Sequence, residues 1–401
     1  MLLQFKCKNH SVFYNETILD LTATQEKNYT DTLFDIKNTK VLPIIEIHGA
    51  NASGKTSILD ALAYMFYMIK FSNKMDVNDA LPTVPFAFSK KAKKENSEYE
   101  ISIIIEETEY RYGFSLNANS FVEEWLYKKK ISSGNDTKQK TIFERYKDKV
   151  TFAPSYNKYK GIWNFLENSI NLNINKSLVL SNIAIKEEKG ELRSIYDYIT
   201  KSSFKIDNNL NQKISINILK NNTSVYVLFE KLLKEFDPCL IRLDIKEDVK
   251  TTGEKTYNIS GVHRDIKTKK EKMIPLSLES SGTIKMFDVL PSILINLEVG
   301  GILCFDELDT KLHPLLFRRI VNMYKDKNIN KNNAQIIYTS HSTVLLNSKE
   351  LRRDEIYFVE KNNLGISTLY SLSEFRNIRI DSDYEKRYLT GEFGAIPFIE
   401  E

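Results

Sequence analysis

The sequence predicts an α/β fold in which a mixed β-sheet is joined by an antiparallel β extension and interrupted by a largely helical insertion. In the C-terminal part, short apolar runs alternate with amphipathic helical segments, a pattern typical of parallel strands connected by helices. In the N-terminal part, alternating segments follow one another closely and favour antiparallel strands. The predicted buried strands are 42–48, 301–305, 334–339 and 355–359, and the predicted antiparallel strands are 99–107, 109–116 and 121–128. Two further strands are predicted at the start of the chain, 2–8 and 17–21.

The chain divides into three predicted parts at the points where the pattern changes. Residues 1–128 form a strand-rich N-terminal lobe, and residues 256–401 form a C-terminal lobe in which strands alternate with helices. The insertion between them, 129–255, is rich in Asn and Lys and contains amphipathic helical segments at 190–201 and 224–236. We expect this insertion to be a largely helical lobe that docks a partner or a second copy.

Bulk composition limits the class of protein without selecting a function. The chain has 401 residues, 42% of them hydrophobic, which suffices for a sizeable buried core. Its 57 basic and 53 acidic residues nearly balance, so the net charge of +4 does not by itself indicate nucleic-acid binding. Cys7, Cys239 and Cys304 have no paired spacing and fit a reducing cytoplasm. Without a long apolar run or a leader, we expect a cytoplasmic protein and no membrane partner.

A glycine-containing loop after the strand 42–48 has the spacing of a phosphate-binding P-loop. Its glycines allow backbone N–H groups to face a phosphate, Lys55 supplies a positive charge, and the Thr56 hydroxyl can bind Mg²⁺. The helix predicted at 56–70 directs its positive N-terminal end at the same anion. We therefore expect a nucleoside triphosphate and Mg²⁺ as cofactors. The loop consists of Gly49, Ala50, Asn51, Ala52, Ser53, Gly54, Lys55 and Thr56.

Two carboxylates follow the apolar strand 301–305. This arrangement places Asp306 near Mg²⁺ and leaves Glu307 to activate water, so the pair predicts hydrolysis in addition to binding. Apolar residues followed by two acids also occur in buried strands without any catalytic role. The position of this pair after a P-loop favours the functional interpretation.

A second anion-binding helix terminus is predicted near residue 280. Ser280, Ser281 and Gly282 precede a helix whose apolar side chains recur at helical spacing. Because the P-loop already supplies one phosphate site, we expect these residues to contact the γ-phosphate held by another copy, in a homodimer or higher homo-oligomer. The alternative is an ordinary serine N-cap.

Two further residues are candidates on the same side of the predicted sheet. His341 follows the strand 334–339, where its ring can hydrogen-bond the γ-phosphate or the attacking water. Asp309 lies three residues after Asp306 and is expected to reach across a dimer interface. A histidine at a strand end is more often structural, and for His313 a packing or capping role is favoured over metal binding.

The order of these motifs resembles the ABC-type ATPase heads of the SMC, RecF and OLD-like group. It is most similar to the bacterial anti-phage ATPases of the abortive-infection AbiL/RloA type, and more distantly to those of the Septu, retron and PARIS systems. The resemblance rests on the segment 279–283, the Leu312-His313-Pro314 turn, the tail 388–397, and Asn9 in Lys8-Asn9-His10-Ser11. It implies an ABC-type P-loop ATPase head that uses ATP and Mg²⁺.

The same resemblance implies a role for each motif residue. Asp306 would be the second metal-site carboxylate, Glu307 the general base, and His341 the γ-phosphate switch. Asp309 would couple the two sites of a dimer. Residues implied in contacts to phosphate, Mg²⁺ or the partner's nucleotide are Lys55, Thr56, Ser280, Ser281 and Gly282.

Two departures from the family pattern affect these expectations. The signature is Ser280-Ser281-Gly282-Thr283, where transporters carry Ser-Gly-Gly-Gln, and no Q-loop glutamine is identified between residues 70 and 100. The Mg²⁺ shell is therefore only partly assigned, and the geometry of the metal and the hydrolysis rate are the properties in doubt.

The leading functional hypothesis is an ATPase that closes as a nucleotide-sandwich dimer and regulates a separate effector, a nuclease or a toxin, in anti-phage defence. A DNA-binding repair ATPase is the first alternative, with Lys90–Lys94 and Lys128–Lys130 as phosphate contacts. Those runs lack interleaved aromatic residues, which favours solvated loops. A soluble subunit of a transporter is the second alternative, and the long insertion argues against it.

Overall fold

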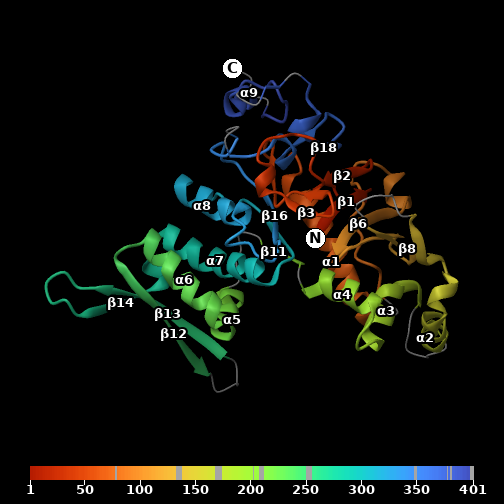
Figure 1. The fold of residues 1–401 in the computed structure, drawn as a ribbon, viewed down its shortest axis with the longest axis horizontal. Helices are drawn as coiled ribbons and strands as arrows, with labels where there is room; N and C mark the ends of the chain where they lie inside the picture. The colour runs from red at the N-terminus through yellow and green to blue at the C-terminus, as the bar shows by residue number, and fades with distance from the viewer. Residues whose placement is uncertain are drawn as a thin grey trace.

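The computed structural model describes residues 1–76, 79–131, 138–167, 174–201, 203–206, 212–249, 255–346, 350–376, 378–379 and 382–397. These residues form two large β-sheets with helices between and around them, and a smaller sheet that projects to one side (Figure 1). Parts of the predicted insertion lie outside the described residues. The α/β fold class, with a mixed sheet and an antiparallel extension, is confirmed.

The first large sheet carries the ends of the functional strands. Its order is β11-β15-β16-β5-β17-β18, and every neighbouring pair is parallel except β17 and β18. Because β15, β16 and β5 are adjacent and parallel, their carboxyl ends lie at one edge of the sheet. The strands are β5 Ile44–His48, β11 Ser203–Ile206, β15 Ile302–Phe305, β16 Gln335–Thr339, β17 Ile356–Lys361 and β18 Ser367–Ser371.

The second large sheet is antiparallel and follows the order β10-β9-β8-β7-β6-β1-β2. All five strands predicted for the N-terminal lobe outside the parallel sheet are present in it, four of them with bounds that differ by one or two residues at one or both ends. The strands are β1 Leu2–Lys8, β2 Thr17–Asp20, β6 Ser97–Ile105, β7 Thr108–Leu116, β8 Phe121–Lys130, β9 Lys140–Tyr146 and β10 Lys149–Phe152, and a separate small hairpin is formed by β3 Phe34–Ile36 and β4 Thr39–Val41.

Helix α1, Lys55–Phe71, lies between the two large sheets and contacts β1 on one side and β15 and β16 on the other. Its apolar residues are therefore buried nearly all round, among them Ile58, Leu62 and Met65. The side chains of β5 alternate between two cores: Ile45 and Ile47 face α1, and Ile44 faces the opposite core. The P-loop is thus anchored on both sides by packed apolar residues.

The segment predicted as a helical insertion contributes to several parts of the fold. Its first half adds β9 and β10 to the antiparallel sheet, and its middle returns to the parallel sheet as β11, which pairs with β15. Two helices of its second half pack on α7 instead. β11 was not predicted, because a short strand within a polar segment shows little of the hydrophobic patterning that indicates a strand. The helices are α2 Asn157–Glu167, α3 Val179–Lys186, α4 Glu191–Lys201, α5 Gln212–Asn221 and α6 Thr223–Phe236.

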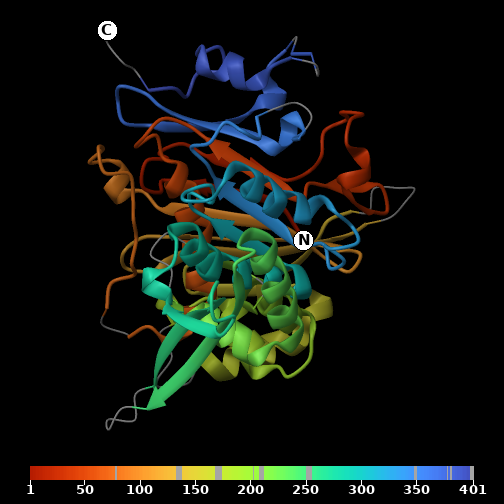
Figure 2. The ribbon, with the colours of Figure 1, turned by 90° about the vertical axis from the view of Figure 1, so that its left-hand side faces the viewer.

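The C-terminal part adds three helices and the small projecting sheet. The small sheet, in the order β12-β13-β14, leaves the body beside α5 and α6 (Figures 1 and 2). Its strands are β12 Leu240–Val249, β13 Lys255–Arg264 and β14 Glu271–Pro275, and the helices are α7 Ser281–Val299, α8 Pro314–Lys325 and α9 Tyr384–Leu389.

The C-terminal tail packs against the parallel sheet. The Phe393 ring lies 5.7 Å from Phe358 of β17 and 5.4 Å from Phe375. The Tyr370 hydroxyl donates to the backbone carbonyl of Phe393 at 2.8 Å. The segment around Phe393 therefore has a packing role.

Candidate nucleotide-binding site

The P-loop conformation depends on its two glycines. A Cβ at Gly49 would lie 2.5 Å from the Val359 carbonyl oxygen, and a Cβ at Gly54 would lie 2.7 Å from Val12 Cγ2. Gly54 also has a φ of 117°, which favours glycine. The loop therefore passes too close to β17 and to the 9–13 turn for any side chain at these positions. The first amides of α1 have no intrahelical partner and face the loop.

Lys55 is buried at the first turn of α1, and its ammonium group points back into the loop. Its Nζ donates to the carbonyl oxygens of Gly49 at 2.8 Å and Ala50 at 3.2 Å. Burial lowers the pKa of Lys55, and the carboxylates of Asp306 and Glu307 act in the opposite direction. The side chain is thus a positive charge held inside the pocket by carbonyl groups, which a phosphate can replace as its partner.

Three oxygen-bearing side chains meet where a metal ion is expected. The Thr56 Oγ1 lies 3.1 and 3.0 Å from the two carboxylate oxygens of Asp306. The Thr339 hydroxyl donates to Asp306 Oδ1 at 2.7 Å and accepts from the Glu307 backbone N–H at 2.8 Å. A hydroxyl and a carboxylate are hard oxygen donors of the type that Mg²⁺ prefers, with its other positions left to water and phosphate.

Thr339 is a site residue that the sequence reasoning missed. It occupies the last position of β16, directly beside the end of β15, and its hydroxyl holds Asp306 and the Glu307 backbone together. The signal that could have found it is its place at the end of a parallel strand next to the Asp-Glu pair.

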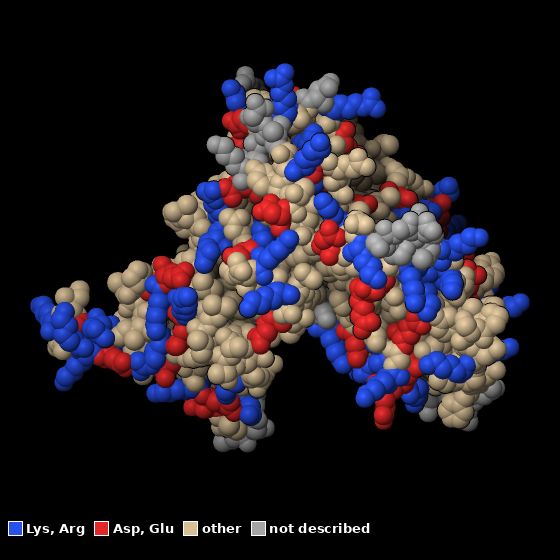
Figure 3. Space-filling view, in the orientation of Figure 1, with Lys and Arg blue, Asp and Glu red and all other residues tan. Residues whose placement is uncertain are grey.

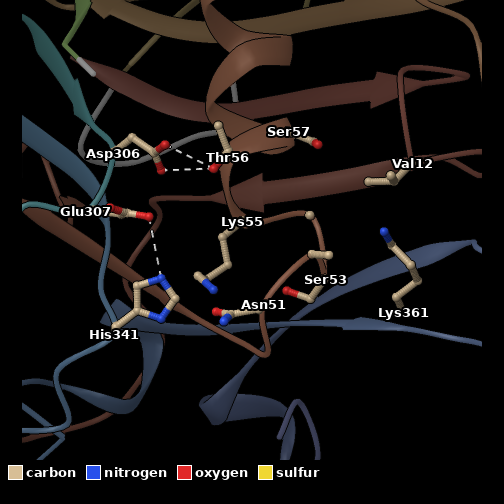
Figure 4. Close-up of a pocket in the computed structure, with 12 residues that line it drawn as sticks. Val12, Asn51, Ser53, Lys55, Thr56, Ser57, Asp306, Glu307, His341 and Lys361 are labelled. Atoms are coloured by element: carbon tan, nitrogen blue, oxygen red, sulfur yellow. Dashed lines mark hydrogen bonds and ion pairs between the residues drawn. The ribbon is translucent and has the colours of Figure 1, made fainter. Parts of the chain in front are cut away.

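Glu307 and His341 face each other across the pocket (Figure 4). The His341 Nε2 lies 3.6 Å from Glu307 Oε1, and the Thr310 hydroxyl lies 3.4 Å from Glu307 Oε2. Glu307 has a φ of 52°, a conformation uncommon for a side-chain-bearing residue, so the backbone turns sharply there. Both side chains are partly exposed to the cavity and can reach a ligand in it.

The Asp309 carboxylate accepts hydrogen bonds from its own chain in this structure. It accepts from the backbone N–H groups of His341 at 3.3 Å and Ser342 at 3.0 Å. Asp309 therefore fixes the loop that carries His341. Its expected role in coupling two copies stays a prediction.

A cavity of about 690 Å³ lies at the carboxyl edge of the parallel sheet, and Asp309 and Thr339 are not among the residues that line it. The cavity brings together the predicted loop residues from Asn51 onward with Asp306, Glu307 and His341 (Figure 4). It also includes Val12, Ser57 and Lys361, which the sequence analysis did not select. Val12 comes from the 9–13 turn and Lys361 from the end of β17, both remote in sequence from the P-loop, so only the folded chain reveals them.

The signature turn lies elsewhere. Among the described residues that line the cavity, none comes from 280–283. Ser280 caps α7, its Oγ accepting from the Thr283 backbone N–H at 3.1 Å, and Ser281 is exposed. The ordinary N-cap expected as an alternative is therefore present, and it leaves Ser281 and the Gly282 backbone accessible from outside.

Asn9, to which the sequence assigned no role, is a buried structural residue beside the P-loop. Its Nδ2 donates to the Ala92 carbonyl at 2.8 Å, and its Oδ1 accepts from the Phe86 backbone N–H at 3.0 Å. Two residues later, Ser11 Oγ lies 3.4 Å from Ser57 Oγ of α1. Asn9 thus ties the segment where a Q-loop was sought to the base of the nucleotide pocket.

The fold and the cavity define an ABC-type P-loop ATPase head. The family described as "AAA domain, putative AbiEii toxin, Type IV TA system" matches residues 47–347, and the chain belongs to this family. That range begins within β5 and extends past His341, so it contains every motif of the site except the 9–13 turn and Lys361.

Two solved structures are among those that match the chain. The SMC head domain from Thermotoga maritima is 14% identical, with a TM-score of 0.43, and the match covers 92% of this chain and 98% of that one. An SMC head bound to the C-terminal winged-helix domain of ScpA is 12% identical, with a TM-score of 0.37, and the match covers 92% and 97%. No curated protein sequence matches the chain significantly. Within the described residues, no helix is both long and apolar enough to cross a membrane.

Proposed function

We propose that two copies of this chain close around ATP and hydrolyse it, and that closure controls a separate effector in anti-phage defence. The observation that carries this proposal is the position of the signature turn. At the N-terminus of a 19-residue helix, Ser281 is exposed and Gly282 is partly exposed, and neither lines the cavity of its own chain. A helix N-terminus is an anion-binding element, so this one is available to a nucleotide held by another copy.

Within each pocket, the chain's own residues divide the work of hydrolysis. The ammonium group of Lys55 and the amides of the P-loop hold the phosphates. Thr56 and Asp306 would hold Mg²⁺, which would neutralise charge on those phosphates. Glu307 accepts the proton of the attacking water, and His341, 3.6 Å from it, donates a hydrogen bond toward the γ-phosphate. Thr339 positions the backbone of Glu307.

In this proposal, ATP hydrolysis switches the protein between a closed and an open dimer. The contacts between the signature turn and the γ-phosphate exist only in the closed dimer, and hydrolysis removes them. The family description names a toxin of a type IV toxin–antitoxin system, which supports a defence role. Within defence ATPases we propose the abortive-infection AbiL/RloA type, with the effector as another chain.

The first test measures the solution mass of the Glu307→Gln variant with and without Mg-ATP by light scattering. Because slowed hydrolysis keeps the nucleotide in place, we expect the mass to double when ATP is added. Lys55→Ala is the matched control and should stay at its ATP-free mass. An unchanged mass for Glu307→Gln with ATP demonstrably bound would contradict the sandwich dimer.

The alternative of a DNA-repair ATPase loses part of its predicted contact surface. Lys128 Nζ is bound by Glu191 Oε1 at 2.8 Å and lies 5.2 Å from the centre of the Tyr156 ring. Lys91 pairs with Glu95 at 3.3 Å. The two basic runs chosen from the sequence are thus partly neutralised by the fold.

A further inference from the structure

The C-terminal tail, residues 382–397, contacts the loop that carries His341. Thr343, two residues after His341, donates its hydroxyl to the Glu385 carboxylate of α9. A hydrogen bond to a charged acceptor is stronger than one between two neutral groups. The tail is therefore linked to the loop of a proposed site residue, in addition to its packing on the sheet.

The same short helix contacts the strand that leads into the P-loop. The Tyr388 ring lies 5.7 Å from the ring of His48, the last residue of β5, and 5.2 Å from the ring of Phe358 on β17. His48 and Tyr388 are both buried. Glu385 and Tyr388 are three residues apart, so their side chains lie on the same side of α9. One turn of helix thus contacts both of the segments that the nucleotide site needs.

The rest of the tail holds α9 in place, because a helix of six residues is not stable by itself. The Tyr388 hydroxyl donates to the Ala395 carbonyl at 3.2 Å. Gly394 has a φ of 67°, which favours glycine, and a Cβ there would lie 2.9 Å from the Tyr370 hydroxyl of β18. The tail therefore folds back on α9 and packs closely on the parallel sheet.

The His341 loop thus has two anchors, one on each side. Asp309 accepts from the backbone N–H groups of His341 and Ser342, and in the proposed dimer it would also face the other copy. The tail packs within its own chain, so dimer closure leaves its anchor in place. We propose that Glu385 positions His341 for hydrolysis through the Thr343 hydroxyl, and that the tail is the fixed support of this histidine. This inference rests on the proposed function, which gives His341 its role.

The test removes the link from each side and compares the result with a change at a neighbouring residue. Glu385→Ala removes the acceptor, and Thr343→Val removes the donor while it keeps the shape of the side chain. Thr343→Ser restores the hydroxyl. The matched control is Lys386→Ala, because Lys386 is exposed on the same helix. Figure 3 shows Lys and Arg side chains on the solvent side of this end of the molecule.

We expect kcat for ATP hydrolysis to fall about tenfold in Glu385→Ala and in Thr343→Val, because a displaced catalytic group slows the reaction. ADP lacks the γ-phosphate that His341 would contact, so the affinity for ADP should not change. Thr343→Ser and Lys386→Ala should keep the wild-type rate within about twofold. An equal loss in Lys386→Ala, or a loss of ADP affinity as large as the loss of kcat, would overturn the proposal.

A double-variant comparison shows whether the link acts through His341. His341→Ala should slow hydrolysis by itself. Glu385→Ala should add no further loss in that background, because the side chain that it positions is then absent. Losses that multiply would show that Glu385 acts on another part of the site, and would overturn the positioning role.

Amide hydrogen exchange separates failure of this proposal from failure of the proposed function. Without nucleotide, Glu385→Ala should speed the exchange of the amides in 340–346 severalfold, and Lys386→Ala should leave it unchanged. Equal exchange in the wild type and in Glu385→Ala would overturn the proposal whether or not the protein hydrolyses ATP. Faster exchange in Glu385→Ala, together with a wild type that hydrolyses no ATP, would support the tail as the anchor of the loop and contradict the proposed ATPase.

Discussion

The two helix N-termini that carry phosphate-binding sequence in this chain differ in what surrounds them. The P-loop at the start of α1 lies in a cavity with a buried lysine, two carboxylates and a histidine. The signature turn at the start of α7 does not line this cavity and is open to solvent at Ser281. The difference teaches that one chain holds most of a catalytic centre and one separate anion-binding turn, which is what the proposed nucleotide-sandwich dimer requires.

The largest expected effect comes from inactivating the P-loop in one variant and the signature turn in another, and then mixing the two variant proteins. Lys55→Ala should reduce ATP hydrolysis by at least about 100-fold by removing the phosphate cation. Gly282→Glu should do the same through repulsion of the γ-phosphate, although Gly282 does not line the cavity. The chain tolerates this glutamate, because a Cβ at Gly282 meets its nearest atoms at 3.7 and 3.8 Å.

Mixing the two inactive variants distinguishes a site shared between copies from a site within one chain. A mixed dimer has one pocket with Lys55 and an intact signature turn, so a steady-state assay should recover part of the wild-type rate. If the mixture stays as inactive as its components while heterodimers form, the signature turn does not act across the interface.

A smaller effect is expected at the residue that holds the catalytic carboxylates. Thr339→Val keeps the shape of the side chain and removes the hydroxyl shared by Asp306 and the Glu307 backbone. Loss of a hydrogen bond to a charged group is worth about 1.5–3 kcal/mol, so hydrolysis should fall about 10- to 100-fold. Raised Mg²⁺ should recover part of the loss if Asp306 is misplaced. Thr310→Val, which removes only the 3.4 Å contact to Glu307, is the control and should have a milder effect.

The smallest effect concerns the helix behind the signature turn. Burial raises the pKa of Asp288 on α7 to about 6, with Lys285 and Lys311 opposing the shift, and its Oδ1 has no hydrogen-bond partner among the described residues. The folded state therefore binds this proton more tightly than the unfolded state, and stability is lost as the pH rises from about 4 to 6. Asp288→Asn should raise the free energy of unfolding at pH 7.5 by about 1 kcal/mol, a value reduced because the group is only half-buried.

Denaturant unfolding at two pH values checks this prediction. At pH 4 the wild type and Asp288→Asn should have the same free energy of unfolding, since the native carboxyl is then protonated. A gain of equal size at both pH values would show that the substitution acts through packing or helix propensity instead of charge.

The strands with strong local patterns were predictable because their side chains alternate or are apolar throughout. β1 was predicted with its observed bounds, and the alternation of strands 301–305, 334–339 and 355–359 with helices predicted the parallel sheet. β11 was missed because it lies in a polar segment and becomes a strand only by pairing with β15. The predicted insertion was similarly placed by composition, while contacts distributed its elements among three parts of the fold.

The sequence by itself determined the phosphate loop, the Asp-Glu pair, the histidine and the signature turn, because each depends on residue types at fixed spacing next to a strand or helix. Only the tertiary structure decided which of them meet. It placed Thr339 between Asp306 and Glu307, turned Asp309 toward the His341 loop, and kept residues 280–283 out of the cavity. It also joined strand β13 to the segment before the signature turn through His263 and Glu279. The physical reason is that sheet order and side-chain contacts join segments hundreds of residues apart, and local spacing carries no information about those distances.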